Sequence, residues 1–204
     1  MKKGDVSIFS IVLGGFLLAA PVCWAEAVVG EAAPDFSLTD VTGEPRALSK
    51  LKGSFVVLEW FNPDCPFVRK HYGGGNMQGL QHAYTQKGVV WLSINSSAPG
   101  KQGHLTLGTA QQFIKEREVH STAVLLDSDG AIGRLYGAKT TPHMFVIDPK
   151  GVLIYAGAID DIASPDPQDI PEAINYVATA LEEAMAGHPV TVPESHSYGC
   201  SVKY

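Results

Sequence analysis

Residues 55–68 read Phe-Val-Val-Leu-Glu-Trp-Phe-Asn-Pro-Asp-Cys-Pro-Phe-Val, and this stretch decides the fold. Its first seven residues are apolar except for Glu59, which is typical of a central strand covered on both faces. Pro66 suits the first position of a helix, so Cys65 is predicted to cap that helix. There the sulfur would meet unpaired amides and the positive end of the helix dipole, which favours the thiolate. The alternative is a small apolar side chain buried at a strand end.

Strands and helices alternate along the rest of the chain. Further strands are predicted at 89–94, 123–126, 144–147 and 152–155, and a hairpin turn at 148–151 joins the last two. Helices are predicted from Cys65 to about His71, from a cap at Asn76, from a capping box of Thr109 and Gln112, and over 174–181. Parallel strands joined by helices and followed by an antiparallel hairpin predict a single α/β domain, a mixed sheet with helices on both faces.

Length and charge narrow the class of protein. A chain of 204 residues with 45% hydrophobic residues can form one sizeable core and is short for two domains. Its net charge of −6 comes without a cluster of Lys and Arg. Such a surface lacks the electrostatic footprint that a nucleic acid or an anionic membrane would require, so neither is expected as a partner.

The first 25 residues are predicted to be a secretory signal peptide. Two lysines precede an apolar run over 8–22, and small residues follow at Ala25 and Ala27. The alternative, a retained membrane anchor, is disfavoured because the run is shorter than the ~20 apolar residues of a spanning helix. We therefore expect a periplasmic or secreted protein with a folded domain over 28–188 and a polar tail over 189–204.

Signal removal changes the cysteine count. Cys23 would leave with the signal peptide, so the mature chain would keep only Cys65 and Cys200 in a compartment that oxidises thiols. Cys200 lies on the tail, whose Gly and Ser content predicts mobility. A permanent bridge would consume the only reactive thiol, so a reversible bond between the two cysteines is the preferred interpretation.

Two further motifs point to a family. Ala33-Pro34-Asp35-Phe36 precedes the first strong strand, and Thr140-Thr141-Pro142-His143 precedes the strand at 144–147. With Cys65 at a helix start, the region from about 30 to 188 resembles the thioredoxin superfamily. More closely it is similar to the redoxin branch, which includes the alkyl hydroperoxide reductase and thiol-specific antioxidant group and the extracytoplasmic thiol-disulfide oxidoreductases.

This resemblance implies a thioredoxin-like fold with a cis bond before Pro142, next to the active cysteine. A cis proline there would leave the backbone of Thr141 free to pair with an incoming chain, so Thr141 and Pro142 are the expected substrate-binding residues. His143 follows directly, and an ordinary surface histidine is favoured over a proton donor or ligand.

The sequence also departs from both families that it resembles. Thioredoxins carry a second cysteine three residues after the first, where this chain has Val68. Peroxiredoxins carry Thr three residues and Pro seven residues before the reactive cysteine, where this chain has Asn62 and Leu58. The missing Thr is one of the groups that stabilise the transition state of peroxide reduction, and Asn62 could replace it in part.

Glu59 lies six residues before Cys65, where thioredoxins hold a buried carboxylate. Burial would raise its pKa and make it a candidate general base, whereas a solvated edge position is the alternative. Arg69, one helical turn after Cys65, is expected to be a solvated charge. The predicted catalytic residues are therefore Cys65, Cys200 and Glu59.

The leading functional hypothesis is an extracytoplasmic thiol-dependent oxidoreductase. Cys65 would attack a protein disulfide, a small-thiol disulfide or a hydroperoxide, Cys200 would resolve the product, and a thiol reductant would complete the cycle. No cofactor is expected, and a homodimer is left open. One alternative is a peroxiredoxin-like thiol peroxidase. An alternative of another class is a copper-handling module in which Cys65 joins His71 or His143, although such proteins usually carry two nearby cysteines.

Overall fold

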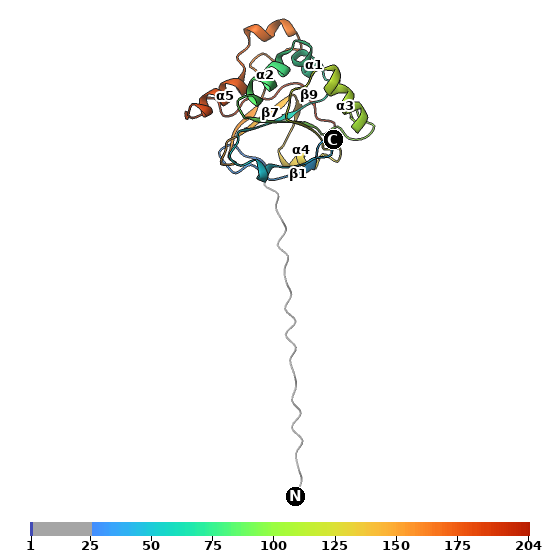
Figure 1. The fold of residues 1–204 in the computed structure, drawn as a ribbon, viewed down its shortest axis with the longest axis vertical. Coiled ribbons are helices and arrows are strands. Elements are labelled where there is room, and N and C mark those ends of the chain that lie inside the picture. Colours follow the sequence, from blue (N-terminus) through green and yellow to red (C-terminus); the bar gives the residue numbers. More distant parts are fainter. Residues whose placement is uncertain (2–25) are drawn as a thin grey trace.

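The computed structural model describes Met1 and residues 26–204, so the signal peptide predicted over 1–25 lies, apart from Met1, outside the described residues. Its centre is a five-stranded sheet in the order β5-β4-β3-β7-β8 (Figure 1). The strands are β3 (Val56–Trp60), β4 (Val90–Asn95), β5 (Ala123–Leu126), β7 (His143–Ile147) and β8 (Leu153–Gly157). β3, β4 and β5 are parallel, whereas β7 and β8 are antiparallel to their neighbours. The predicted mixed α/β sheet is confirmed.

Helices and two small sheets surround this centre. The helices are α1 (Pro66–Gly73), α2 (Asn76–Thr85), α3 (Leu107–Glu116), α4 (Ala131–Leu135) and α5 (Tyr176–Met185), with 3₁₀-helices η1 (Leu48–Leu51) and η2 (Pro167–Glu172). β1 (Ser37–Thr39) pairs with β2 (Pro45–Ala47), and β6 (Thr140–Thr141) pairs with β9 (Cys200–Ser201). The pair β6-β9 joins the far end of the chain to the segment before β7.

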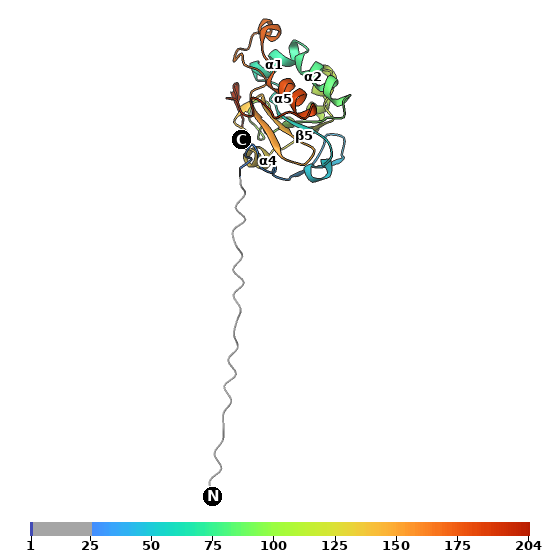
Figure 2. The ribbon, with the colours of Figure 1, turned by 90° about the vertical axis from the view of Figure 1, so that its left-hand side faces the viewer.

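Each face of the central sheet carries its own core. Alternate residues of β3 such as Val57 pack with residues of α1, α2, α3 and α5. The others, such as Leu58 and Trp60, pack with Tyr136, with η1 and with residues of α4. Figure 2 shows α1, α2 and α5 on one side and α4 on the other. Helices on both faces leave β3 fully buried, which explains its nearly continuous apolar sequence.

Several helix starts differ from the sequence prediction. Thr106, not Thr109, caps α3, because the two threonines form a reciprocal capping box in which Thr109 is the third helical residue. Gly75, with φ +72°, precedes α2, and the side chain of Asn76 instead bonds to His71. The prediction that Asn76 caps this helix was therefore wrong.

Two further differences concern short or flanking segments. The five-residue helix α4 was not predicted, since one turn is too short to show helical periodicity. Ile174, predicted on the inward face of the last helix, is 59% exposed. It lies outside α5, because Asn175 caps that helix by accepting a bond from the amide of Ala178.

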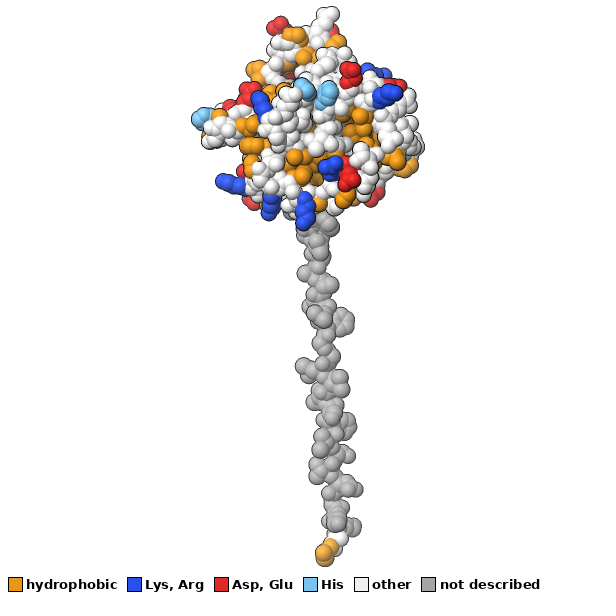
Figure 3. Space-filling model, in the orientation of Figure 1, with side chains coloured by type: hydrophobic (Ala, Val, Ile, Leu, Met, Phe, Trp, Pro, Cys, Tyr) orange, Lys and Arg blue, Asp and Glu red, His pale blue; other side chains and the backbone are white. Residues whose placement is uncertain are grey.

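Acidic and basic side chains are interspersed on the face drawn in Figure 3. Within residues 26–204, no helix has the length and apolar character needed to cross a membrane.

Candidate active site

Cys65 lies where the central strand β3 gives way to α1. Its backbone is extended, with φ −74° and ψ 125°, and it occupies the cap position directly before Pro66. This is the predicted setting, because proline is pre-organised for a first helical turn. The side chain is completely buried, and its thiol donates a 3.0 Å hydrogen bond to the carbonyl of Thr141. The Thr141–Pro142 peptide bond is cis, as the family resemblance implied.

Cys200 reaches the same place from the far end of the chain. Strand β9 pairs antiparallel with β6, and Cys200 lies opposite Thr141 in that register. Each of the two thiols shifts the pKa of the other, so the structure brings these two predicted residues together within one chain. Both are free thiols. The tail was predicted to be mobile, but it is docked, with Tyr198 and Tyr204 anchored on either side of Cys200.

The pKa values of the two thiols are shifted in opposite directions. Burial raises the pKa of Cys65, but hydrogen bonds from the Cys200 thiol, the Thr141 hydroxyl and the amides of Val68 and Cys200 lower it by more, so the net shift is downward. Burial raises the pKa of Cys200 to about 11, with help from the adjacent Cys65, while Lys203 acts in the opposite direction. Cys65 is therefore the more acidic of the two thiols.

Glu59 is fully buried in the middle of the sheet, so the solvated edge position is wrong. Its two oxygens accept four hydrogen bonds of 2.8 to 3.0 Å, from the side chains of Tyr72, Gln81, Trp91 and Ser93. Burial raises the pKa of the carboxyl and these four bonds act to lower it, with a net upward shift. Within residues 26–204 no hydrogen bond joins Glu59 to Cys65, although both lie on the face covered by α1.

A buried polar cluster beside the thiols was not predicted. Lys70 and His71 of α1 lie 3.7 and 3.8 Å from the same carboxylate oxygen of Asp160, and both side chains are completely buried. Tyr198 of the tail donates a short hydrogen bond to Asp160 and packs its ring 5.7 Å from that of Phe67. Burial, followed by the charge of Lys70, lowers the pKa of His71 to about 3. No sequence spacing signals this cluster, because Asp160 and Tyr198 are far from α1 in the chain.

The remaining polar candidates are Asn62, Arg69 and His143, and each of them bonds to a nearby loop. The side chain of Asn62 donates to the carbonyl of Gln102 at 3.1 Å and accepts from the amide of Asp64 at 2.8 Å. Arg69 is a largely exposed charge, as expected, and pairs with Asp64 at 2.8 Å. His143 is buried rather than on the surface, and burial with the nearby Lys139 lowers its pKa to about 4. Its Nδ1 accepts from the amide of Lys139, which fixes the turn before β7.

Among residues 26–204 no group of three or more His, Cys, Asp or Glu side chains is arranged to hold a metal ion.

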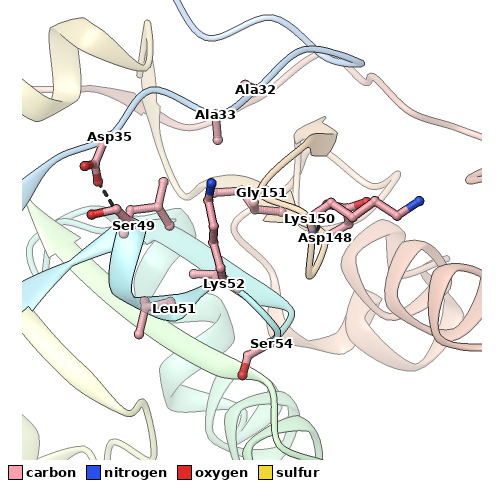
Figure 4. A pocket seen from close by; sticks show the side chains of 13 residues that line it. Ala32, Ala33, Asp35, Ser49, Leu51, Lys52, Ser54, Asp148, Lys150 and Gly151 are labelled. Carbon is pink, nitrogen blue, oxygen red and sulfur yellow. Dashed lines mark hydrogen bonds between the residues drawn. The ribbon is translucent and has the colours of Figure 1, made fainter.

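A hollow of about 250 Å³, drawn in Figure 4, is lined by residues such as Asp35, Ser49, Lys52 and Val56. Val56 begins β3, whereas Cys65 follows the end of that strand. The hollow therefore lies at the opposite end of the sheet from the thiols.

Comparisons with known proteins agree with this geometry. The chain is 28% identical over 126 residues to the thiol-disulfide oxidoreductase ResA of Bacillus thuringiensis, covering 62% of this chain and 67% of that protein. A crystal structure of an uncharacterized conserved protein from Geobacillus kaustophilus superposes with a TM-score of 0.75 at 26% identity, covering 87% and 92% of the two chains.

A putative thiol:disulfide interchange protein DsbE from Chlorobium tepidum superposes with a TM-score of 0.52 at 30% identity, covering 64% of this chain and 85% of that one. The predicted thioredoxin-like fold and redoxin resemblance are confirmed. The sequence model of the AhpC/TSA family matches residues 29–156, more than half of the chain. This protein therefore belongs to the AhpC/TSA family.

Proposed function

We propose that this protein is an extracytoplasmic thiol-disulfide oxidoreductase in which Cys65 is the nucleophile and Cys200 of the same chain is the resolving thiol. The relatives named as thiol-disulfide oxidoreductases support an oxidoreductase activity. The observation that carries the mechanism is the pairing of Cys200 with Thr141, the residue whose carbonyl accepts the hydrogen bond of the Cys65 thiol. The extracytoplasmic location rests on the predicted signal peptide.

The reaction transfers two electrons in two exchanges. The Cys65 thiolate attacks one sulfur of a substrate disulfide, and the other substrate sulfur leaves as a thiolate. Cys200 then loses its proton and attacks the Cys65 sulfur, which releases the second substrate thiolate and forms the Cys65–Cys200 disulfide. A thiol reductant restores both thiols and is itself oxidised to a disulfide.

The charge state of Cys65 controls when Cys200 can act in the second exchange. Two of the three causes that raise the pKa of Cys200 are its hydrogen bond to Cys65 and the Cys65 charge. Both are lost when Cys65 becomes part of a mixed disulfide, so the pKa of Cys200 falls at the step where its thiolate is needed. We propose Glu59 as the general base, a buried group that accepts a proton, and its raised pKa suits that role.

Peroxide reduction is the second activity to measure. A hydroperoxide would convert Cys65 to a sulfenic acid and release an alcohol, and Cys200 would then displace water. The hydrogen bonds to Gln102 and Asp64 use the oxygen of Asn62 and one of its two N–H donors, so most of this side chain is committed to the loops and not to a peroxide. We therefore expect disulfide exchange to be faster than turnover of hydroperoxide.

Peptide mapping of the oxidised protein tests this function. Wild-type protein should form an intrachain Cys65–Cys200 disulfide, and Cys200→Ser protein should stop at a mixed disulfide on Cys65. Cys65→Ser protein should be inactive with its Cys200 unreacted. A wild-type protein in which Cys65 becomes sulfinic while Cys200 stays free would contradict the resolving role. N-terminal sequencing of exported protein tests the location.

A further inference from the structure

The tail that carries Cys200 has a side-chain anchor on each side of this cysteine. After Cys200, the hydroxyl of Tyr204 donates to the backbone carbonyl of Ala138 at 2.8 Å. Before Cys200, the hydroxyl of Tyr198 donates to the carboxylate of Asp160. A hydrogen bond to a charged acceptor is stronger than one to a neutral carbonyl, so we expect the anchor at Asp160 to contribute more to the docking of the tail.

Asp160 is buried and is held by the helix that carries the nucleophile. Its carboxylate lies 3.7 Å from Lys70 Nζ and 3.8 Å from His71 Nε2, and both residues belong to α1, which begins directly after Cys65. Lys70 remains beside the carboxylate when Tyr198 leaves. The tail can therefore undock without leaving a buried charge unpaired.

Tyr198 restricts the position of Cys200, because only Gly199 separates the two residues. Two residues of extended chain span at most about 7 Å, so Cys200 stays near the site while Tyr198 is bound. Tyr198 and Cys200 both pack against the core cluster that contains Cys65, and Cys65 has no exposed surface. A substrate sulfur can therefore reach Cys65 only when the tail has moved.

The two exchanges of the proposed cycle need different positions of the tail. Attack by Cys65 on a substrate disulfide needs the tail displaced, whereas attack by Cys200 on the Cys65 sulfur needs it back in place. The bond between Tyr198 and Asp160 does not include Cys65, whose thiol donates to Thr141 instead. This bond can therefore form again while a substrate group is still attached to Cys65.

We propose that Asp160 is a positioning residue for the resolving step, which binds Tyr198 and thereby returns Cys200 to the sulfur of Cys65. The inference rests on the proposed function, because it concerns the second exchange of that cycle. Without this bond Cys200 attacks from a less restricted tail, at a lower effective concentration beside the Cys65 sulfur. The bond thus slows the first exchange, which needs the displaced tail, and accelerates the second.

Stopped-flow absorbance separates the two exchanges when reduced protein is mixed with one equivalent of dipyridyl disulfide. Attack by the Cys65 thiolate forms a mixed disulfide and releases one pyridinethione. Attack by Cys200 on the Cys65 sulfur releases the second pyridinethione and leaves the Cys65–Cys200 disulfide. Tyr198→Phe should slow the second phase by at least about tenfold, because it removes a hydrogen bond to a charged group. It should also accelerate the first phase.

Tyr84→Phe is the matched control. The Tyr84 hydroxyl also donates to a carboxylate, that of Glu182 at 3.3 Å, but it lies on α2 and does not bond to the tail. Tyr84→Phe should change neither phase. If Asp160 acts through Tyr198, adding Asp160→Asn to Tyr198→Phe protein should slow the second phase by less than about twofold more. The Tyr198→Phe variant decides the test even if Asp160→Asn does not fold.

The outcomes separate this inference from the proposed function. A second phase that is equally fast in wild-type and Tyr198→Phe protein would overturn the positioning role and retain the resolving role of Cys200. Equal slowing of both phases by Tyr198→Phe would also overturn it, because a general loss of structure affects both exchanges. A wild-type protein that releases one pyridinethione per chain and keeps Cys200 free would contradict the resolving role, and with it this inference.

Discussion

Replacing Gly199 by alanine should uncover Cys65 without unfolding the domain. The new Cβ would meet the Thr141 carbonyl oxygen at 2.1 Å, so β9 must shift by about an ångström, enough to break its pairing with β6. The positive φ of +124° alone costs about 1–2 kcal/mol for a residue with a side chain. That energy raises the population of the undocked tail by about 5- to 30-fold, and the steric clash adds to it.

The assay is alkylation of Cys65 by iodoacetamide in a Cys200→Ser background, at a pH where the thiolate is fully formed. The rate should rise by at least about fivefold, because it follows the population of the open form. Gly187→Ala is the matched control, since Gly187 has φ +81° but nothing within 4 Å of a Cβ. Equal rates in the two variants would refute the reasoning. The reasoning would also be refuted if Gly199→Ala lowered the free energy of unfolding in urea by as much as the free energy that corresponds to the rise in alkylation rate.

The remaining predictions concern the buried charges. Cys200→Ala should raise the pKa of Cys65 more than Cys200→Ser, which keeps a hydroxyl donor, and the pH profile of iodoacetamide labelling measures it. Glu59→Leu should lower the free energy of unfolding by about 2–6 kcal/mol in urea, because at least two buried donors lose their acceptor, and Glu59→Gln should cost less. Since the pKa of Glu59 is raised in the fold, its contribution to stability should decline as pH rises from the unfolded value through the folded one, and Glu59→Gln should abolish this decline. Asp160→Asn should cost about 3–5 kcal/mol in urea, because the buried Lys70 loses its counter-charge.

Local chemistry made much of the fold predictable. An apolar strand, a cysteine and a proline sufficed to place Cys65 at the start of α1, because proline geometry and helix capping depend on adjacent residues. The hairpin of β7 and β8 followed from its turn at 148–151 for the same reason. The cap of α3 was predicted three residues too late, at Thr109, because Thr109 and Gln112 also have the spacing of a capping box.

The site was only partly predictable. Cys65 and Cys200 were selected by counting thiols, but the strand pairing that unites them joins two-residue strands, too short to show any periodicity. The cluster of Lys70, His71 and Asp160 is formed by tertiary packing. From the sequence alone a lysine on a helix is expected to be solvated, whereas Lys70 is buried. Long-range contacts of this kind leave no local pattern.

The position of β9 in the chain has a consequence for biogenesis. The sheet and α1 are encoded before residue 158, whereas the strand that covers Cys65 begins at residue 200. A chain made from its N-terminus at about 5–20 residues per second thus passes through seconds in which the sulfur of Cys65 has no cover. During that interval the Cys65 thiol can exchange with disulfides of other molecules, each of which releases one thiol, so the order of synthesis exposes this sulfur before the fold can protect it.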